Sequence, residues 1–269
     1  MNTLAGFILP PKGASPNAED IFELYLMLLI MSAVVFVAVE GLLIWFTIKY
    51  KARRGRVAAQ IHGNTRLEVG WTVGAAVVLV FITAVTFIKL PGIKDPAASD
   101  IDAQGNPVAS NAMFASTDQE APPKGDSMRI VVDGQQYVWR YQYPAQGNKT
   151  VYAYEETVVP VGMTVILNIT SDDVAHSWWI PALGGKMDAV PGYVNKTWFK
   201  ATKAGIYRGQ CAELCGRNHA NMTARVRAVP FDQYQSWFDQ QASDIQSARD
   251  EGAKQRAEIN KQQSTTQTP

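Results

Sequence analysis

Two long apolar segments in the first third of the chain constrain its fold more than any other feature. The first covers roughly residues 24–48, with Glu40 as its only charged residue, and the second covers roughly 69–88, with none. A helix that spans a bilayer needs about 20 such residues. The segments therefore predict a transmembrane helical hairpin, and a pair of buried core helices is the alternative. The opening residues lack the basic region that a cleaved signal peptide carries.

Basic residues concentrate in the connection between these segments and predict its side of the membrane. The connection contains Lys49, Lys51, Arg53, Arg54, Arg56 and Arg66. The flank before the first segment instead contains one basic residue, Lys12, and three acidic residues, Glu19, Asp20 and Glu23. Because basic loops stay cytoplasmic, we expect both ends of the chain on the outer side. The whole chain has 25 basic and 24 acidic residues, a balance that argues against a nucleic acid partner.

Composition divides the rest of the chain into parts. We expect an extracytoplasmic segment at 1–20, the hairpin at 21–90, an irregular linker at 91–126, a β-rich domain at 127–230 and a polar helix or tail at 231–269. Short runs rich in β-branched and aromatic residues predict strands at 128–132, 137–143, 163–169 and 223–229. Short strands without helical periodicity between them favour a small sandwich or barrel.

The start of the last part has aromatic residues at helical spacing. Phe231, Tyr234 and Phe238 predict a helix that packs its first turns on the β-rich domain. Beyond about Ser247 the sequence is polar on all sides, and we expect it to fray.

The two cysteines of the chain stand in a cluster of metal-binding residue types. Cys211 and Cys215 are followed by His219 and Met222 in the run CAELCGRNHANM, and His176 lies upstream in HSWWIP. Thiolate and thioether donors with imidazole favour copper, whereas two cysteines with two histidines alone would suit zinc. A mononuclear blue-copper site needs one cysteine, but two thiolates can bridge two copper ions. Zinc and a local disulfide remain alternatives.

The segment 176–222 resembles the CuA site of cytochrome c oxidase subunit II. Three further runs resemble the same family: HGNTRLEVGWT at 62–72, DGQQYVWRYQYP at 133–144 and GGKMDAVPG at 184–192. The resemblance covers roughly residues 20–230. It implies a two-helix transmembrane hairpin that carries an all-β, cupredoxin-like Greek-key sandwich.

The resemblance also implies roles for individual residues. Cys211 and Cys215 would bridge two copper ions, His176 and His219 would each bind one, Met222 would be a weak ligand and Glu213 would contribute its backbone carbonyl. The Glu213 carboxylate, supported by Asp188, would bind a magnesium ion shared with subunit I. Glu68 would mark the entrance of a proton path into subunit I. A solvated surface carboxylate is the alternative for each of these three acids.

Two departures from the family pattern affect electron uptake. Tyr137 stands where the family has a tryptophan thought to accept electrons, with Trp139 expected two residues later on the same strand face. Gln135 replaces a histidine. Asp172 and Asp173 resemble acidic residues that steer a basic cytochrome c, with a solvated acidic turn as the alternative.

The implied function is that of an enzyme subunit in a proton-pumping oxidase of the plasma membrane. CuA would take electrons from cytochrome c and pass them to a haem in subunit I, which also holds CuB, while subunit III completes the complex. A CuA-containing nitric oxide reductase subunit, a structural subunit of a quinol oxidase and a stand-alone copper protein are the alternatives. No Cys-x-x-Cys-His run is present, so no fused haem c domain is expected.

Overall fold

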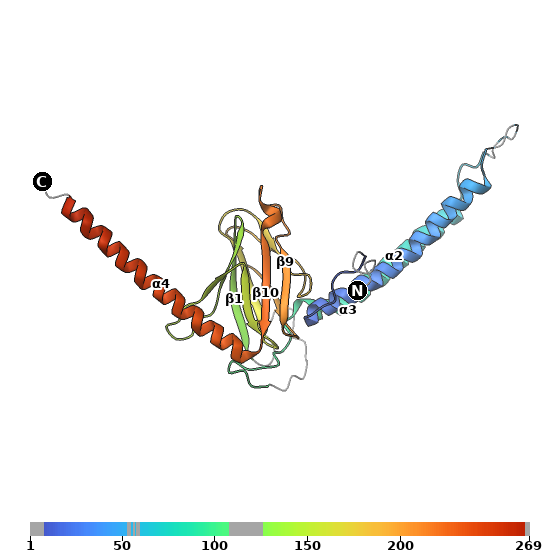
Figure 1. Cartoon of the computed structure of the whole chain (residues 1–269). Coiled ribbons are helices and arrows are strands. Elements are labelled where there is room, and N and C mark those ends of the chain that lie inside the picture. The colour runs from blue at the N-terminus through green and yellow to red at the C-terminus, as the bar shows by residue number, and fades with distance from the viewer. Residues whose placement is uncertain (1–7, 53–54, 56, 58–59, 108–125, 267–269) are drawn as a thin grey trace.

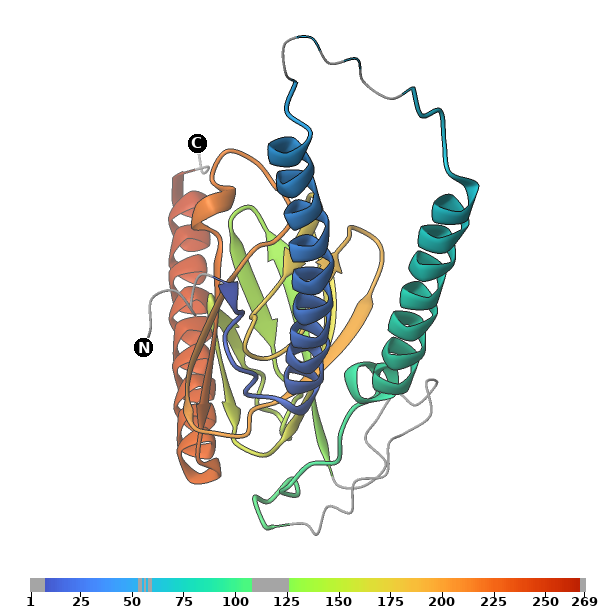
Figure 2. The ribbon, with the colours of Figure 1, turned by 90° about the vertical axis from the view of Figure 1, so that its right-hand side faces the viewer.

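The computed structural model describes residues 8–52, 55, 57, 60–107 and 126–266. Two helices, α2 (Pro16–Lys49) and α3 (Thr65–Lys94), form an antiparallel hairpin that projects from a β-sandwich (Figures 1 and 2). Both are long and apolar enough to cross a membrane. At the outer end, the Lys89 ammonium lies 2.8 Å from Asp20 and 2.5 Å from Glu23, which joins the two helices.

Helix α3 continues further than the sequence indicates. The linker was expected from residue 91, but Pro91 lies inside the helix and the Asp95 N–H still donates to the Pro91 carbonyl. Proline removes one helical hydrogen bond without forbidding the turn after it. The Trp198 indole N–H donates to the Ile93 carbonyl at 3.1 Å and so stabilises the last turn.

Ten strands build the domain after the hairpin, and their arrangement confirms the predicted β-sandwich. The strands are β1 (Ser127–Gln135), β2 (Val138–Gln142), β3 (Tyr152–Tyr154), β4 (Glu156–Pro160), β5 (Thr164–Ser171), β6 (His176–Trp178), β7 (Met187–Ala189), β8 (Asn195–Lys200), β9 (Gly205–Gln210) and β10 (Thr223–Val229). One sheet has the order β3-β2-β1-β5-β8, a second has β4-β10-β9, and β6 pairs with β7 alone. The pairs β1/β5 and β4/β10 are parallel, so the chain crosses between the sheets.

The sandwich core is made by the inward faces of these strands. Trp139, Leu167, Ile169 and Val226 are fully buried between the sheets. Alternation along β2 and β10 places such side chains on the inward face, whereas β5 is buried over most of its length. The core reaches the loop between β9 and β10, because Cys211, Cys215 and Met222 belong to the same buried cluster.

The hairpin is fixed to the sandwich by buried polar contacts. The Asn17 amide donates to the Trp198 carbonyl at 2.9 Å, and the Lys200 N–H donates to the Ser15 hydroxyl at 3.0 Å. Residues 95–107 of the expected linker run along the sandwich, where the buried Ser99 hydroxyl accepts from the Thr164 N–H at 2.9 Å. The remainder of that linker, 108–125, lies outside the described residues.

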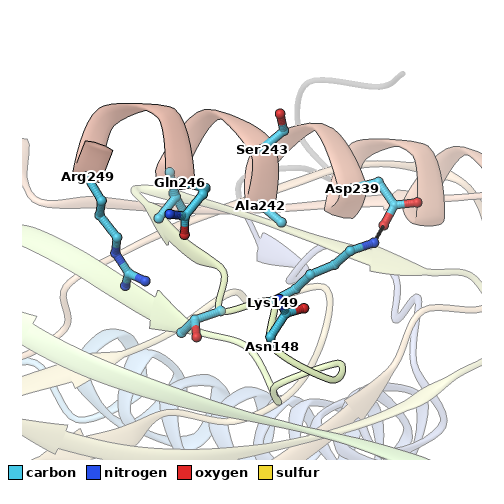
Figure 3. A pocket seen from close by; sticks show the side chains of 9 residues that line it. Asn148, Lys149, Asp239, Ala242, Ser243, Gln246 and Arg249 are labelled. Carbon is cyan, nitrogen blue, oxygen red and sulfur yellow. Dashed lines mark hydrogen bonds and ion pairs between the residues drawn. The ribbon is translucent and has the colours of Figure 1, made fainter. Parts of the chain in front are cut away.

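The last helix, α4 (Phe231–Thr266), starts on the sandwich and then leaves it (Figure 1). Tyr234 and Phe238 are buried as expected, and Lys149 of the β2–β3 loop forms an ion pair with Asp239 at 2.7 Å beside a polar cavity (Figure 3). The expectation that the chain frays beyond Ser247 is wrong. Good helix formers and side-chain pairs four residues apart, such as Gln246 to Asp250, keep it helical.

Candidate metal centre

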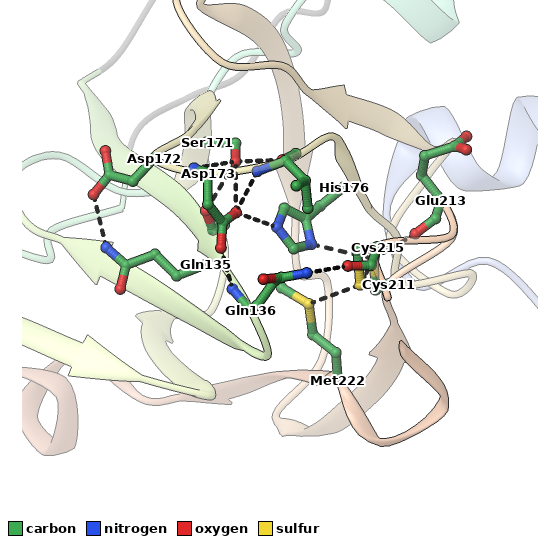
Figure 4. Close-up of polar contacts among 12 residues, drawn as sticks. Gln135, Gln136, Ser171, Asp172, Asp173, His176, Cys211, Glu213, Cys215 and Met222 are labelled. Carbon is green, nitrogen blue, oxygen red and sulfur yellow. Dashed lines mark hydrogen bonds and ion pairs between the residues drawn. The ribbon is translucent and has the colours of Figure 1, made fainter. Parts of the chain in front are cut away.

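Five potential donors come together at one end of the sandwich, where the β9–β10 loop meets β6, and Figure 4 labels four of them. The loop provides Cys211, Cys215, His219 and Met222, and the first residue of β6 is His176. The Cys211 N–H donates to the Met222 carbonyl at 2.8 Å and closes the loop. The Ala212 N–H donates to the Ser177 carbonyl at 2.8 Å and ties the loop to β6.

The donor atoms lie at distances that suit metal ligands. The two thiol sulfurs are 3.9 Å apart, so the cysteines are free rather than disulfide-bonded. Two sulfurs on one metal with bonds of about 2.3 Å would lie roughly 3.8 Å apart. The donor atoms of His176, Cys211 and Cys215 all lie within 4.8 Å of one another, and these three residues are buried.

Each thiol has its own imidazole. Cys211 Sγ lies 3.8 Å from His176 Nδ1, and Cys215 Sγ lies 3.5 Å from His219 Nδ1. Met222 Sδ is 3.9 Å from Cys215 Sγ, and the Glu213 carbonyl is 3.2 Å from Cys211 Sγ. This donor set fits two ions that share two sulfurs better than it fits one tetrahedral ion, because it offers more ligands than one tetrahedral ion takes.

Burial favours the protonated form of the Cys215 thiol in the absence of metal. Burial, and then the neighbouring Cys211, raise the pKa of the Cys215 thiol to about 11. A metal ion must therefore displace protons from this site as it binds.

Asp173 orients the imidazole of His176, a role that the sequence analysis did not assign to it. Its carboxylate lies 2.8 Å from His176 Nε2, which leaves Nδ1 to face Cys211. Although partial burial opposes the shift, hydrogen bonds from His176 and from the Gln136 and Val174 N–H groups lower the pKa of Asp173. A carboxylate behind a ligating imidazole fixes its tautomer and orientation. The three-residue spacing Asp173 to His176 is the sequence signal for this contact.

Glycine makes room for the site at two positions. A Cβ on Gly134 would lie 2.9 Å from the His176 ring, and a Cβ on Gly209 would lie 1.8 Å from the Trp179 carbonyl oxygen. Both side chains would push β6 away from its neighbours. Gly134 belongs to the DGQQYV run, but its spatial role is visible only in the structure.

The expected arrangement of Tyr137 and Trp139 on one strand face is wrong. Gln135 pairs with Val138, so Gln136 and Tyr137 form the two-residue connection of a hairpin and only Trp139 lies in β2. Trp139 is fully buried, with its ring centroid 5.8 Å from that of His176. Tyr137 is partly exposed, and it lies against Gly216 of the cysteine loop.

The remaining predicted residues lie around this centre without joining it. Asp172 is exposed and accepts from the Gln135 amide at 2.7 Å, with the Arg140 guanidinium 3.6 Å away. Glu213 turns its carbonyl toward the sulfurs and its exposed carboxylate away from them (Figure 4). Asp188 is exposed on β7, opposite Ser177.

Glu68 has a local structural contact at the inner end of α3. Its carboxylate accepts from the Asn64 N–H at 3.3 Å, while the Asn64 side chain accepts from the Leu67 N–H. The pair caps the helix, and the proton-path role of Glu68 stays a prediction.

Two family profiles match this chain. The profile described as cytochrome C oxidase subunit II, transmembrane domain, matches residues 3–88, and that described as the periplasmic domain of the same subunit matches residues 147–229.

Individual relatives carry the same description. Cytochrome c oxidase subunit 2 of Alkalihalophilus pseudofirmus is 31% identical over 253 residues, which are 93% of this chain but only 66% of that protein. The probable subunit 2 of Rickettsia bellii is 32% identical and covers 85% of this chain and 81% of that one. The crystal structure of the periplasmic domain of cytochrome oxidase subunit II from Bradyrhizobium japonicum has 36% identity, covers 45% of this chain and 97% of that one, and gives a TM-score of 0.42.

Proposed function

Because this chain belongs to the cytochrome c oxidase subunit II family, we propose that it holds a binuclear CuA centre and relays electrons from cytochrome c to subunit I. The observation that carries this proposal is the pair of free thiols 3.9 Å apart, each with its own imidazole. A copper pair bound there would supply single-electron storage shared between two ions.

The residues of the site have distinct tasks in this proposal. Cys211 and Cys215 would hold both ions, His176 and His219 would hold one each, and Met222 and the Glu213 carbonyl would complete the set. Burial of the sulfurs and of His176 excludes water, which limits the solvent rearrangement that accompanies a change of charge. Asp173 keeps Nδ1 of His176 directed at Cys211.

The surroundings suggest where the partners bind. The chain is a membrane protein with its β domain on the outer side, and we place it in the plasma membrane. Cytochrome c would approach Asp172 and Tyr137, both accessible beside the centre. Magnesium would lie between the Glu213 and Asp188 carboxylates and subunit I, with Glu68 facing the proton path of that subunit and subunit III completing the complex.

Electron paramagnetic resonance with copper analysis of the full-length protein tests the copper assignment. We expect two copper ions per chain and a hyperfine pattern from one electron shared by both nuclei, lost in Cys215→Ser. Leu214→Ala is the matched control, because Leu214 is 77% exposed in the same loop and offers no ligand. The pattern of a single copper ion, or zinc in its place, would refute the proposal.

A further inference from the structure

The short connection between β1 and β2 lies directly against the cysteine loop. The Gln136 side-chain amide donates to the Cys215 carbonyl at 2.6 Å (Figure 4). A Cβ on Gly216 would lie 2.9 Å from this amide nitrogen and 2.6 Å from the Tyr137 hydroxyl oxygen. Gly216 also has a φ of +136°, which favours glycine. The loop therefore has a glycine at the position where the connection approaches it.

The main chain of Gln136 makes a second contact, on the other side of the metal centre. Its N–H donates to one carboxylate oxygen of Asp173 at 2.7 Å. The other oxygen of Asp173 lies 2.8 Å from His176 Nε2. Gln136 thus connects the carboxylate behind one potential ligand, His176, to the backbone of another, Cys215.

The position of Cys215 decides several distances of the donor set at once. Its sulfur lies 3.5 Å from His219 Nδ1 and 3.9 Å from both Met222 Sδ and Cys211 Sγ. A displacement of the Cys215 backbone would change all three distances together. Sites that hold metal need their donors within about 0.5 Å of the required geometry, and neighbouring hydrogen bonds supply that precision.

The side chain of Gln136 can be altered without altering the rest of this arrangement. Its N–H belongs to the main chain, so every substitution except proline keeps the contact with Asp173. Gln136 is exposed, so the packing of the sandwich core does not depend on its side chain. A substitution therefore removes the hydrogen bond to Cys215 selectively.

We propose that Gln136 is a positioning residue of the metal centre. Its side chain holds Cys215 while its main chain holds Asp173 behind His176, so that the cysteine loop and β6 keep the spacing that two shared ions require. The inference rests on the proposed copper function, but its test on the metal-free protein does not.

Alkylation of the metal-free, full-length protein tests the contact without copper. Gln136→Met keeps the length of the side chain and removes the donor. At a fixed pH, Cys215 should react roughly two- to tenfold faster in this variant, because the loop has lost one hydrogen bond. Mass spectrometry locates the modified cysteine, and circular dichroism checks the fold.

The matched control is the same substitution one residue earlier. Gln135→Met removes an amide that donates to Asp172 at 2.7 Å and does not touch the cysteine loop. Cys215 should react in this variant as in the unaltered chain. Equal alkylation rates in all three proteins, or equal acceleration by both substitutions, would overturn the role of Gln136.

Copper loading tests the consequence for the metal centre. Gln136→Met should bind copper about tenfold more weakly, and its electron paramagnetic resonance spectrum and reduction potential should shift, whereas those of Gln135→Met should not. An unchanged affinity, spectrum and potential in Gln136→Met would refute the positioning role. If the unaltered chain fails to hold two copper ions, the proposed function is refuted, and the alkylation rates still decide whether Gln136 holds Cys215.

Discussion

At the residue scale, Asp173 lies in a surface turn and its carboxylate is 2.8 Å from Nε2 of His176, a proposed metal ligand. Asp173→Asn should reduce the affinity for copper by about 10–100-fold, because the His176 imidazole loses the carboxylate that orients it. Competition against a copper chelator, with the folded state checked by circular dichroism, measures this change. Asp172→Asn is the control, since the Asp172 carboxylate interacts with the Gln135, Arg140 and Asp133 side chains, whereas Asp173 is the carboxylate at His176 Nε2. An equal loss in both variants would contradict the assigned role.

The Cys215 thiol gives a prediction with a defined pH range. Its pKa is raised from 9.0 to about 11 by burial, so the folded, metal-free protein keeps a proton that the unfolded chain releases near pH 9. The contribution of the Cys215 thiol to the free energy of unfolding is therefore fully present below pH 9 and is lost as the pH rises toward 11. Alkylation of the metal-free protein should be slow at pH 7.5 and accelerate toward pH 11. Fast alkylation at pH 7.5 in the folded protein would contradict a protonated, buried thiol.

At the scale of elements, α4 divides into a half that contributes to the core and a half that does not. Phe238→Ala should destabilise the domain by about 3–5 kcal/mol, because a fully buried aromatic side chain is removed. Ile259→Ala, at a position that is 51% exposed, should change stability by less than about 0.5 kcal/mol. Urea unfolding followed by tryptophan fluorescence separates the two. A large loss of stability in Ile259→Ala would mean that the second half of α4 also makes stabilising packing contacts.

The elements also show where sequence patterns suffice and where they do not. The apolar runs predict both membrane helices, and runs of β-branched and aromatic residues predict β1, β5 and β10 closely. The strand predicted at 137–143 begins one residue too early, because the aromatic Tyr137 fits the strand pattern. Gln135 pairs with Val138, so Tyr137 lies in the connection between β1 and β2. The predicted boundary between hairpin and linker at residue 91 is wrong, because the last turn of α3 is stabilised by the hydrogen bond from Trp198 to Ile93, and Trp198 lies on a strand far away in the sequence.

In the candidate site, too, sequence patterns predict some features, whereas others depend on contacts between distant parts of the chain. Residue type and spacing single out His176, Cys211, Cys215, His219 and Met222, and the fold brings their donor atoms together. Their role as copper ligands stays a prediction. Contacts that depend on packing, such as Asp173 behind His176 or Gly134 beneath the ring, have no periodic signal in one sequence.

At the scale of the whole molecule, buried polar contacts hold the β domain on its membrane hairpin. Asn17 is 2% exposed, donates to the Trp198 carbonyl and accepts from the Ser15 hydroxyl and the Ala18 N–H. It thus connects the first turn of α2 to β8. A Cβ on Gly184 would lie 2.7 Å from the Asn17 amide, so the junction has no spare room. The domain is expected to be held in one orientation toward the partner subunit.

Asn17→Ala should loosen this junction without altering the metal ligands. The loss leaves a buried carbonyl unpaired and should cost about 1–3 kcal/mol locally. The copper spectrum should stay unchanged, while electron transfer from the copper centre to the haem of the assembled oxidase slows and protease cleavage near the junction accelerates. Flash-induced kinetics measure the transfer, and Asp244→Asn on the exposed side of α4 is the control. If cleavage accelerates but the transfer rate stays constant, the partner subunit, rather than the junction, fixes the orientation of the domain.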